Sequence, residues 1–257
     1  MVIAVINTKG GVGKTTTAIH LSVLLAGRGP TLLIDADSQA GASLGVGIPR
    51  ARLAPSLAHP FLYGLPLERA IRRGVRPGID VITASADLAN TDVALSDAPD
   101  RELCLRRTIE PLLQRYRTIL IDCAPGLSLL HINVLAAAQW YLVPVTPQYL
   151  SLEGAASIVD AGDRVRRRFN DRLRLLGMVV TMVDRGSKSG RQNIRMLRGH
   201  YRDAVVRPEI PFSHALAEAP SFGQTIFEYE PAGAAARAYR RLGVDILQRL
   251  ARRGRAH

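Results

Sequence analysis

Short, nearly continuous apolar runs alternate along the chain with longer segments in which apolar residues recur at helical spacing. The runs predict six β-strands, at Val2–Ile6, Thr31–Ile34, Ile79–Thr83, Thr118–Ile121, Tyr141–Val145 and Leu175–Thr181. The longer segments predict six helices, at Lys14–Arg28, Arg101–Tyr116, Leu129–Ala138, Leu152–Phe169, Arg191–Arg202 and Ala232–Arg252. Apolar strands separated by helices are typical of a doubly wound, mostly parallel α/β sheet, which binds ligands at the carboxyl ends of its strands.

Two stretches lack this alternation. Residues Gly45–Gly78 carry several Pro, Gly and Arg residues and are expected to be irregular, with one short helix near Pro66–Arg73. Residues Gly186–Gly190 are expected to form an exposed loop. The sequence contains no repeat, low-complexity tract or linker, so a single domain over residues 1–257 is expected.

The first predicted strand is followed by a glycine-rich loop that leads directly into a helix. The run reads Lys9-Gly10-Gly11-Val12-Gly13-Lys14-Thr15-Thr16. Glycines let backbone N–H groups face an anion, and the helix presents its positive N-terminal end to the same anion. In phosphate-binding loops the lysine reaches the β- and γ-phosphates, and the next hydroxyl ligates Mg²⁺. The run therefore predicts ATP and Mg²⁺ as ligands, with Lys14 on the phosphates and Thr15 on the metal.

The loop departs from the standard pattern because Thr8 stands where the first glycine is expected, and Lys9 precedes two glycines. This is the deviant Walker A motif, and the whole run resembles the ParA/MinD superfamily. The resemblance implies that Lys9 reaches across a homodimer interface to the partner's nucleotide. A cation that arrives only when two subunits meet acts like an arginine finger supplied in trans.

Carboxylates end two further predicted strands, at the edge where such a sheet binds its ligand. Asp35 and Asp37 follow the second strand, and Asp122 follows the fourth. The first pair resembles the family's DxDxQ element, which implies that Asp37 orients the attacking water and that Asp35 supports the Mg²⁺ shell. Asp122 matches the Walker B aspartate that holds Mg²⁺, and Ala124–Leu130 resembles the switch segment. A polar strand end or a helix cap is the simpler alternative for the acidic residues.

The resemblance extends to the end of the chain and is strongest to short ParA proteins, which lack an N-terminal helix-turn-helix. It implies that Met182, in the Thr181–Asp184 strand end, and Pro211, near the late loop, contact the base. It also implies an ATPase with weak basal activity that a ParB-like or cargo-adaptor protein stimulates. Such proteins segregate plasmid or chromosomal DNA or position another cargo, and the sequence does not say which.

The net charge of +12 and a sequence pI of about 10.6 favour a polyanionic partner, nucleic acid before an anionic membrane. An arginine-rich proteome is the alternative explanation. Many ParA relatives bind DNA without sequence preference as the ATP-bound dimer, through arginines whose positions fall here near Gly186, Phe212 and Ala215. Those arginines are therefore missing or displaced.

Another basic series is the candidate replacement. Four arginines at spacings of 4, 3 and 4 are expected on one helix face, with two cations before them: Arg185, Lys188, Arg191, Arg195, Arg198 and Arg202. A single-face basic stripe suits the phosphates of non-specific DNA. An ordinary solvated helix face is the alternative.

Two rival classes share this fold. A MinD-like membrane ATPase needs a free amphipathic tail, whereas the apolar stripe Leu242, Ile246 and Leu250 is suited to docking on the protein's own core. A metal-cluster carrier needs paired cysteines, and Cys104 and Cys123 form no such motif. No secretion signal or run of roughly 20 apolar residues is visible. A cytoplasmic, nucleoid-associated protein is therefore expected.

Overall fold

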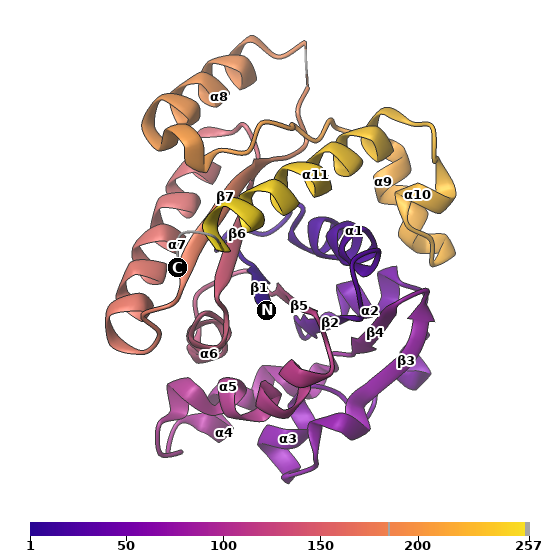
Figure 1. Ribbon diagram of the computed structural model, residues 1–257, viewed down its shortest axis with the longest axis vertical. Coiled ribbons are helices and arrows are strands. Elements are labelled where there is room, and N and C mark those ends of the chain that lie inside the picture. Colours follow the sequence, from indigo (N-terminus) through magenta and orange to yellow (C-terminus); the bar gives the residue numbers. More distant parts are fainter. Residues whose placement is uncertain (185, 255–257) are drawn as a thin grey trace.

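The structure, a computed structural model, describes residues 1–184 and 186–254, and Figure 1 shows its central sheet between two layers of helices. Seven strands form the sheet: β1 (Val2–Val5), β2 (Thr31–Ala36), β3 (Ile71–Arg76), β4 (Ile79–Ile82), β5 (Thr118–Cys123), β6 (Trp140–Val145) and β7 (Arg174–Val180). Their order is β3-β4-β2-β5-β1-β6-β7, and every neighbouring pair is parallel except β3 with β4. The predicted doubly wound, mostly parallel sheet is confirmed.

Helices cover both faces because the inner strands are apolar on both sides. Helices α1 (Lys14–Ala26) and α11 (Ala234–Gly254) pack together against one face. Helices α5 (Cys104–Ile109), α6 (Leu129–Ala137) and α7 (Tyr149–Arg168) form the other layer. The remaining α-helices are α2 (Gly41–Gly45), α3 (Ala58–Tyr63), α4 (Thr91–Leu95), α8 (Lys188–Tyr201), α9 (His214–Glu218) and α10 (Ile226–Tyr229).

The apolar stripe of α11 docks on the core, as the sequence predicted. The side chains of Leu242 and Ile246 are completely buried, and Leu250 packs against the same cluster. Within residues 1–184 and 186–254, no helix is both long and apolar enough to cross a membrane.

The sequence missed the edge strand β3, which occupies part of the stretch expected to be irregular. The expected short helix is confined to one 3₁₀ turn, Leu67–Ala70, after which the chain turns extended and pairs antiparallel with β4. Pro77 and Gly78 join the two strands, and Gly78 has a φ of +73°, as position three of a type II turn requires. Charged side chains on β3 conceal the strand pattern, because an edge strand has one open side that tolerates them.

Two predicted helices have different bounds in the structure. The helix expected over Arg101–Tyr116 is divided into 3₁₀, α and 3₁₀ segments, because Pro111 has no N–H to continue an α-helix. The loop expected over Gly186–Gly190 ends early, since α8 begins at Lys188. Ser187 caps that helix by accepting a hydrogen bond from the Gly190 N–H at 3.0 Å.

Candidate nucleotide site and basic surface

The glycine-rich loop connects β1 to α1 and presents an uncapped helix N-terminus. Gly11 and Gly13 have φ values of +70° and +81°, in the left-handed region that favours glycine. Gly13 is the N-cap of α1, no side chain caps the helix, and its first turn holds no acidic residue. The first N–H groups of α1 therefore remain available to an anion, as a phosphate site requires.

Neighbouring strands hold this loop in place. The Thr181 hydroxyl donates to the Val12 carbonyl at 2.9 Å, and the Asn7 side chain donates to the Pro144 carbonyl at 2.7 Å while accepting from the Lys9 N–H at 3.1 Å. Neither Asn7 nor the bracing role of Thr181 was predicted from the sequence. The position of Asn7, at the end of β1 just before the loop, is the one signal that could have identified it.

The two loop lysines lie in different surroundings. Lys14 is 6% exposed and its ammonium donates to the Lys9 carbonyl at 2.9 Å. Burial lowers the pKa of Lys14, and the carboxylates of Asp122 and Asp37 oppose that shift. Lys9 is half-buried as a residue, and its ammonium donates to the Gln148 side-chain oxygen at 3.3 Å on the exposed side of the loop.

The structure places Asp35 and Asp122 side by side, because they are register partners at the ends of β2 and β5. The Asp122 carboxylate is fully buried, and neither of its oxygens has a hydrogen-bond partner in the described structure. Burial, and next the charge of Asp35, raise the pKa of Asp122 well above its ordinary value. The nearby Thr15 hydroxyl and Lys14 ammonium lower it, but by less. A cation at this place would favour the charged form of the orphaned carboxylate.

The surroundings fit Mg²⁺ in particular. Among residues 1–184 and 186–254 there is no group of three His, Cys, Asp or Glu side chains able to enclose a metal ion. Mg²⁺ is usually held by one or two protein oxygens together with water and substrate phosphates. Asp122 with Thr15 next to the uncapped α1 N-terminus meets that description.

Asp35 is already occupied by the protein. Its carboxylate accepts hydrogen bonds from the Ser43 N–H and hydroxyl, both at 2.7 Å, and from the Asp37 N–H at 3.1 Å. Burial raises the pKa of Asp35 to about 6, although these hydrogen bonds favour its charged form. Ser43 was not predicted from the sequence, because it lies eight residues beyond Asp35 and meets it only where α2 folds back.

Asp37 lies at the mouth of the same cluster, half-buried. One of its oxygens accepts the Gln39 N–H at 2.9 Å. Its carboxylate contributes to the electrostatic surroundings of Lys14 and Asp122, so the three acidic residues and Lys14 form one group. The sequence-predicted residues on β2, β5 and the loop are thus brought together.

The segment after Asp122 crosses the glycine-rich loop. A Cβ added to Gly10 would lie 3.6 Å from the Pro125 ring, and the Gly126 N–H donates to the Thr8 carbonyl at 2.9 Å. A shift of this segment would therefore move the loop that faces the nucleotide.

His131 and Asp92 anchor this segment. Nδ1 of His131 accepts the Ser128 N–H at 3.0 Å, so Nε2 carries the proton that is donated to the Ala124 carbonyl at 2.9 Å. Asp92, on α4, accepts from the N–H groups of Leu129 and Leu130 at 3.2 and 3.0 Å. Neither anchoring role was predicted from the sequence, because each depends on a contact across a turn or between elements.

A cavity of about 190 Å³ opens next to the loop. Gly13, Thr16 and Tyr239 line it together with the two predicted base-contact residues, Met182 and Pro211. Met182 has a φ of +53°, and its side chain is 40% exposed. The sequence-predicted base contacts therefore border a hollow that is continuous with the phosphate loop.

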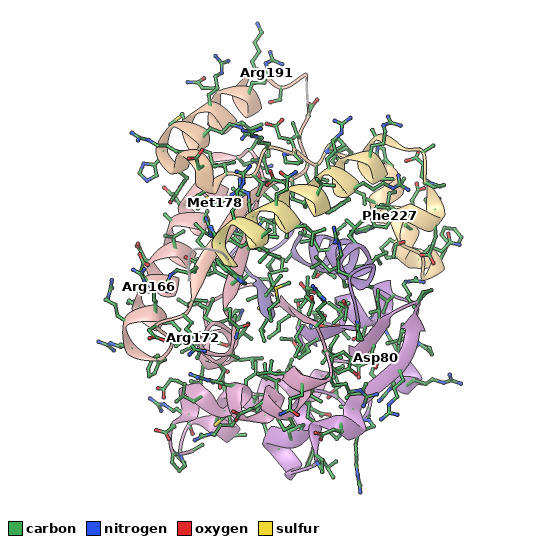
Figure 2. All side chains as sticks on the ribbon, viewed as in Figure 1. Asp80, Arg166, Arg172, Met178, Arg191 and Phe227 are labelled. Carbon is green, nitrogen blue, oxygen red and sulfur yellow. The ribbon has the colours of Figure 1, made fainter. Side chains whose placement is uncertain are left out.

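The predicted basic stripe is divided in the structure. Lys188, Arg191 and Arg195 are exposed along the first turns of α8, and Figure 2 shows Arg191 at the outer end of that helix. Arg198 turns inward instead, because it pairs with Glu209 at 2.9 Å. Arg202 lies one residue past the end of α8, so the expected four-arginine helix face is not continuous. Arg185 lies outside the described residues.

The two cysteines are not assigned a role in the nucleotide site. Cys104 is half-buried and Cys123 buried, and both are free. Burial, together with the charge of Asp122, raises the pKa of the Cys123 thiol well above its usual range. Its position in β5 makes it a core residue.

Comparisons with known proteins agree with this geometry. Residues 1–175 match the AAA_31 family, described as an AAA domain. The chain is 38% identical to the chromosome partitioning protein ParA of Caulobacter vibrioides, over 96% of this chain and 94% of that protein. It is 41% identical to the chromosome-partitioning ATPase Soj of Thermus thermophilus, over 96% of both. A solved structure named cobyrinic acid a,c-diamide synthase, from Mycobacterium smegmatis with bound ADP and magnesium, matches with a TM-score of 0.84 and 28% identity, over 98% of this chain and 96% of that one.

Proposed function

Because this chain belongs to the ParA family of partitioning ATPases, we propose that it binds MgATP, dimerises around it and uses hydrolysis to position DNA or another cargo. The observation that carries the proposal is the unpaired, buried Asp122 carboxylate next to the uncapped N-terminus of α1. These features suit a cation and a phosphate chain at the same place. The relatives at 38% and 41% identity favour partitioning over the synthase named for the structural neighbour.

The position of each residue in the site determines its proposed role. Lys14 and the N–H groups of the loop, Gly10 to Thr16, hold the phosphates, while Met182 and Pro211 border the base. Thr15 and Asp122 hold Mg²⁺, which neutralises charge on the phosphates, and Asp35, anchored by Ser43, supports the Mg²⁺ shell. Asp37, half-buried at the mouth, orients the attacking water and accepts its proton.

The dimer completes the site. Lys9 lies at the rim, where its ammonium donates to the Gln148 side chain at 3.3 Å. In the dimer it moves onto the partner's nucleotide and adds positive charge where negative charge develops. Hydrolysis by the isolated protein is therefore weak, and a ParB-like or adaptor protein accelerates it. Residues 1–257 act as one ATPase domain that associates with the nucleoid.

The test is binding to random-sequence duplex DNA with ATP, ADP or no nucleotide, over a range of salt concentrations. Tight binding with ATP alone, weakening steeply with salt, is expected because counterion release drives non-specific DNA binding.

Substituting Lys188, Arg191 and Arg195 together by Gln should make the salt dependence shallower by about three units of slope. Arg198 is left intact, since its pair with Glu209 is structural. Binding that is equal in all nucleotide states would contradict the switch.

His131 provides a separate test of the switch segment. His131→Leu leaves the Ser128 N–H and the Ala124 carbonyl without partners, so we expect turnover to fall about tenfold, equivalent to about 1.4 kcal/mol, with little change in ATP affinity. His131→Gln should recover part of the activity, because Gln at this helix position restores the cap on the Ser128 N–H. Stimulated ATPase rates and ATP affinities of the three proteins distinguish this role. Equal loss in both variants, or loss of affinity alone, would reject it.

A further inference from the structure

A basic hollow of about 500 Å³ lies where α8 ends, between the 3₁₀ turn Arg202–Ala204 and the last turns of α11. Six arginines line it: Arg198, Arg202, Arg207, Arg249, Arg252 and Arg253. It borders the start of β7, because Arg249 donates to the Leu176 carbonyl at 3.4 Å. The nucleotide loop lies at the other end of that strand, roughly 20 Å away by strand length.

Two of these arginines form the rigid wall of the hollow. Arg249 pairs with Asp245 at 2.6 Å and donates to the Asp203 carbonyl at 2.8 Å. Arg198 pairs with Glu209 at 2.9 Å. Each of these guanidinium groups ties two elements together, so the wall keeps its shape without a ligand.

Arg253 closes the inner end of the hollow. It donates to the Leu175 carbonyl, and its guanidinium lies 5.5 Å from the centre of the Trp140 ring. Burial, and next the charge of Arg249, lower the pKa of Arg253.

The other three arginines line the hollow, and the described residues do not engage their guanidinium groups. Arg202, Arg207 and Arg252 are exposed, and no hydrogen bond or ion pair to any described residue holds their guanidinium groups. Arg202 also has a φ of 45° with a ψ of −120°, a conformation that non-glycine residues rarely adopt. Of the two aspartates in the lining, Asp245 is already paired, so positive charge is in clear excess.

We propose that this hollow binds phosphates of duplex DNA and continues the contact surface of α8 to the end of α11. The proposal rests on the DNA-binding part of the proposed function. α8 rises about 1.5 Å per residue, which places Arg202 roughly 16 Å beyond Arg191. That span equals the rise of about five base pairs along the duplex axis, so the two ends of α8 can reach different phosphates of one duplex. Figure 1 shows the ends of α8 and α11 together at the β7 side of the sheet.

The chemistry of the lining favours a phosphate backbone over a lipid surface. Planar guanidinium groups match phosphate oxygens through paired N–H donors. The apolar side chain among the lining residues is Val205, which is buried, and the apolar stripe of α11 is committed to the core. A lipid anchor would need an apolar face here to enter the bilayer.

The test compares two double variants with the same loss of charge, both in the full-length protein with ATP. Arg207→Gln/Arg252→Gln removes two of the three hollow arginines that no described contact engages, and leaves Arg202 with its unusual backbone conformation intact. Arg106→Gln/Arg167→Gln removes two exposed arginines from α5 and α7, in the opposite helix layer. Affinity for random-sequence duplex DNA is measured over a salt series. The hollow variant should bind about tenfold or more weakly near 0.1 M salt, with a slope shallower by about two units, while the control changes little.

Trp140 supplies a second readout, because it is the sole tryptophan of the chain and lies under Arg253. DNA should change its fluorescence saturably in the wild type and the control variant, and in the hollow variant only at about tenfold or more higher DNA concentration. Equal affinities and slopes for the two double variants would reject the hollow as a phosphate-binding site, but they would not contradict the proposed function. A wild type that binds no DNA in any nucleotide state would instead reject the DNA-binding function, and the hollow with it. Binding of phosphatidylserine vesicles, but not DNA, through Arg207 and Arg252 would assign the hollow to lipid and reject the proposal.

Discussion

Replacing Lys14 by Ala is expected to weaken ATP binding at least about a hundredfold, equivalent to about 2.8 kcal/mol. Lys14 is the buried cation of the loop, and its ammonium lies among the carboxylates of Asp122 and Asp37. Without it, a bound triphosphate would face those carboxylates with one compensating charge fewer, in a region where burial strengthens electrostatic interactions. Equilibrium titration with a fluorescent ATP analogue in the presence of Mg²⁺ measures the change directly.

Two further variants show which property of Lys14 matters. Lys14→Gln keeps a donor for the Lys9 carbonyl but removes the charge, so it should bind ATP almost as weakly as Lys14→Ala. Lys9→Ala removes a lysine from the same loop, yet it should retain monomer affinity, because Lys9 lies at the rim against Gln148. Thermal unfolding without nucleotide checks that each variant is folded. Unchanged ATP affinity in a folded Lys14→Ala protein would remove the phosphate-loop assignment.

Asp37→Ala is expected to lower the rate of ATP hydrolysis by about 10² to 10⁴, the usual contribution of a positioned general base. ATP binding should survive, since Asp37 lies at the mouth of the site and Lys14 and the loop N–H groups remain. The protein should then accumulate as an ATP-bound dimer. Phosphate release gives the rate, and light scattering after size exclusion gives the mass with ATP and with ADP.

Asp37→Asn serves as the matched control for local structure. An Asn side-chain oxygen can still accept the Gln39 N–H that Asp37 accepts at 2.9 Å, so the turn is kept and only the charge is lost. Both variants should fail to hydrolyse ATP if the carboxylate acts as a base. If Asp37→Ala hydrolyses ATP at the wild-type rate, Asp37 has no part in the reaction.

Features encoded in consecutive residues were predictable from the sequence. A few consecutive residues suffice to recognise the glycine-rich loop, its lysines and the strand ends carrying Asp35 and Asp122. Local backbone conformation and burial determine each of these features. Six of the seven strands were recognised for the same reason. Edge strand β3 was not recognised, because half of its environment is solvent and its arginines hide the alternation.

Side-chain partnerships between distant segments required the tertiary structure. Nothing in the sequence indicates that Asp92 caps the start of α6, since the two lie more than thirty residues apart. The spacing of the α8 arginines likewise does not show that Glu209 withdraws Arg198 from the stripe.

The sequence by itself determined the class of fold and the family, and it indicated the residues proposed for a nucleotide site. Periodicity and short motifs depend on local backbone geometry, which each segment carries alone. The tertiary structure decided that the Asp122 carboxylate stays unpaired while Asp35 is satisfied by Ser43, and that arginines from α8 and α11 meet around one hollow. Burial and hydrogen-bond satisfaction belong to the packed chain, because they depend on which side chains share a volume after distant segments have come together.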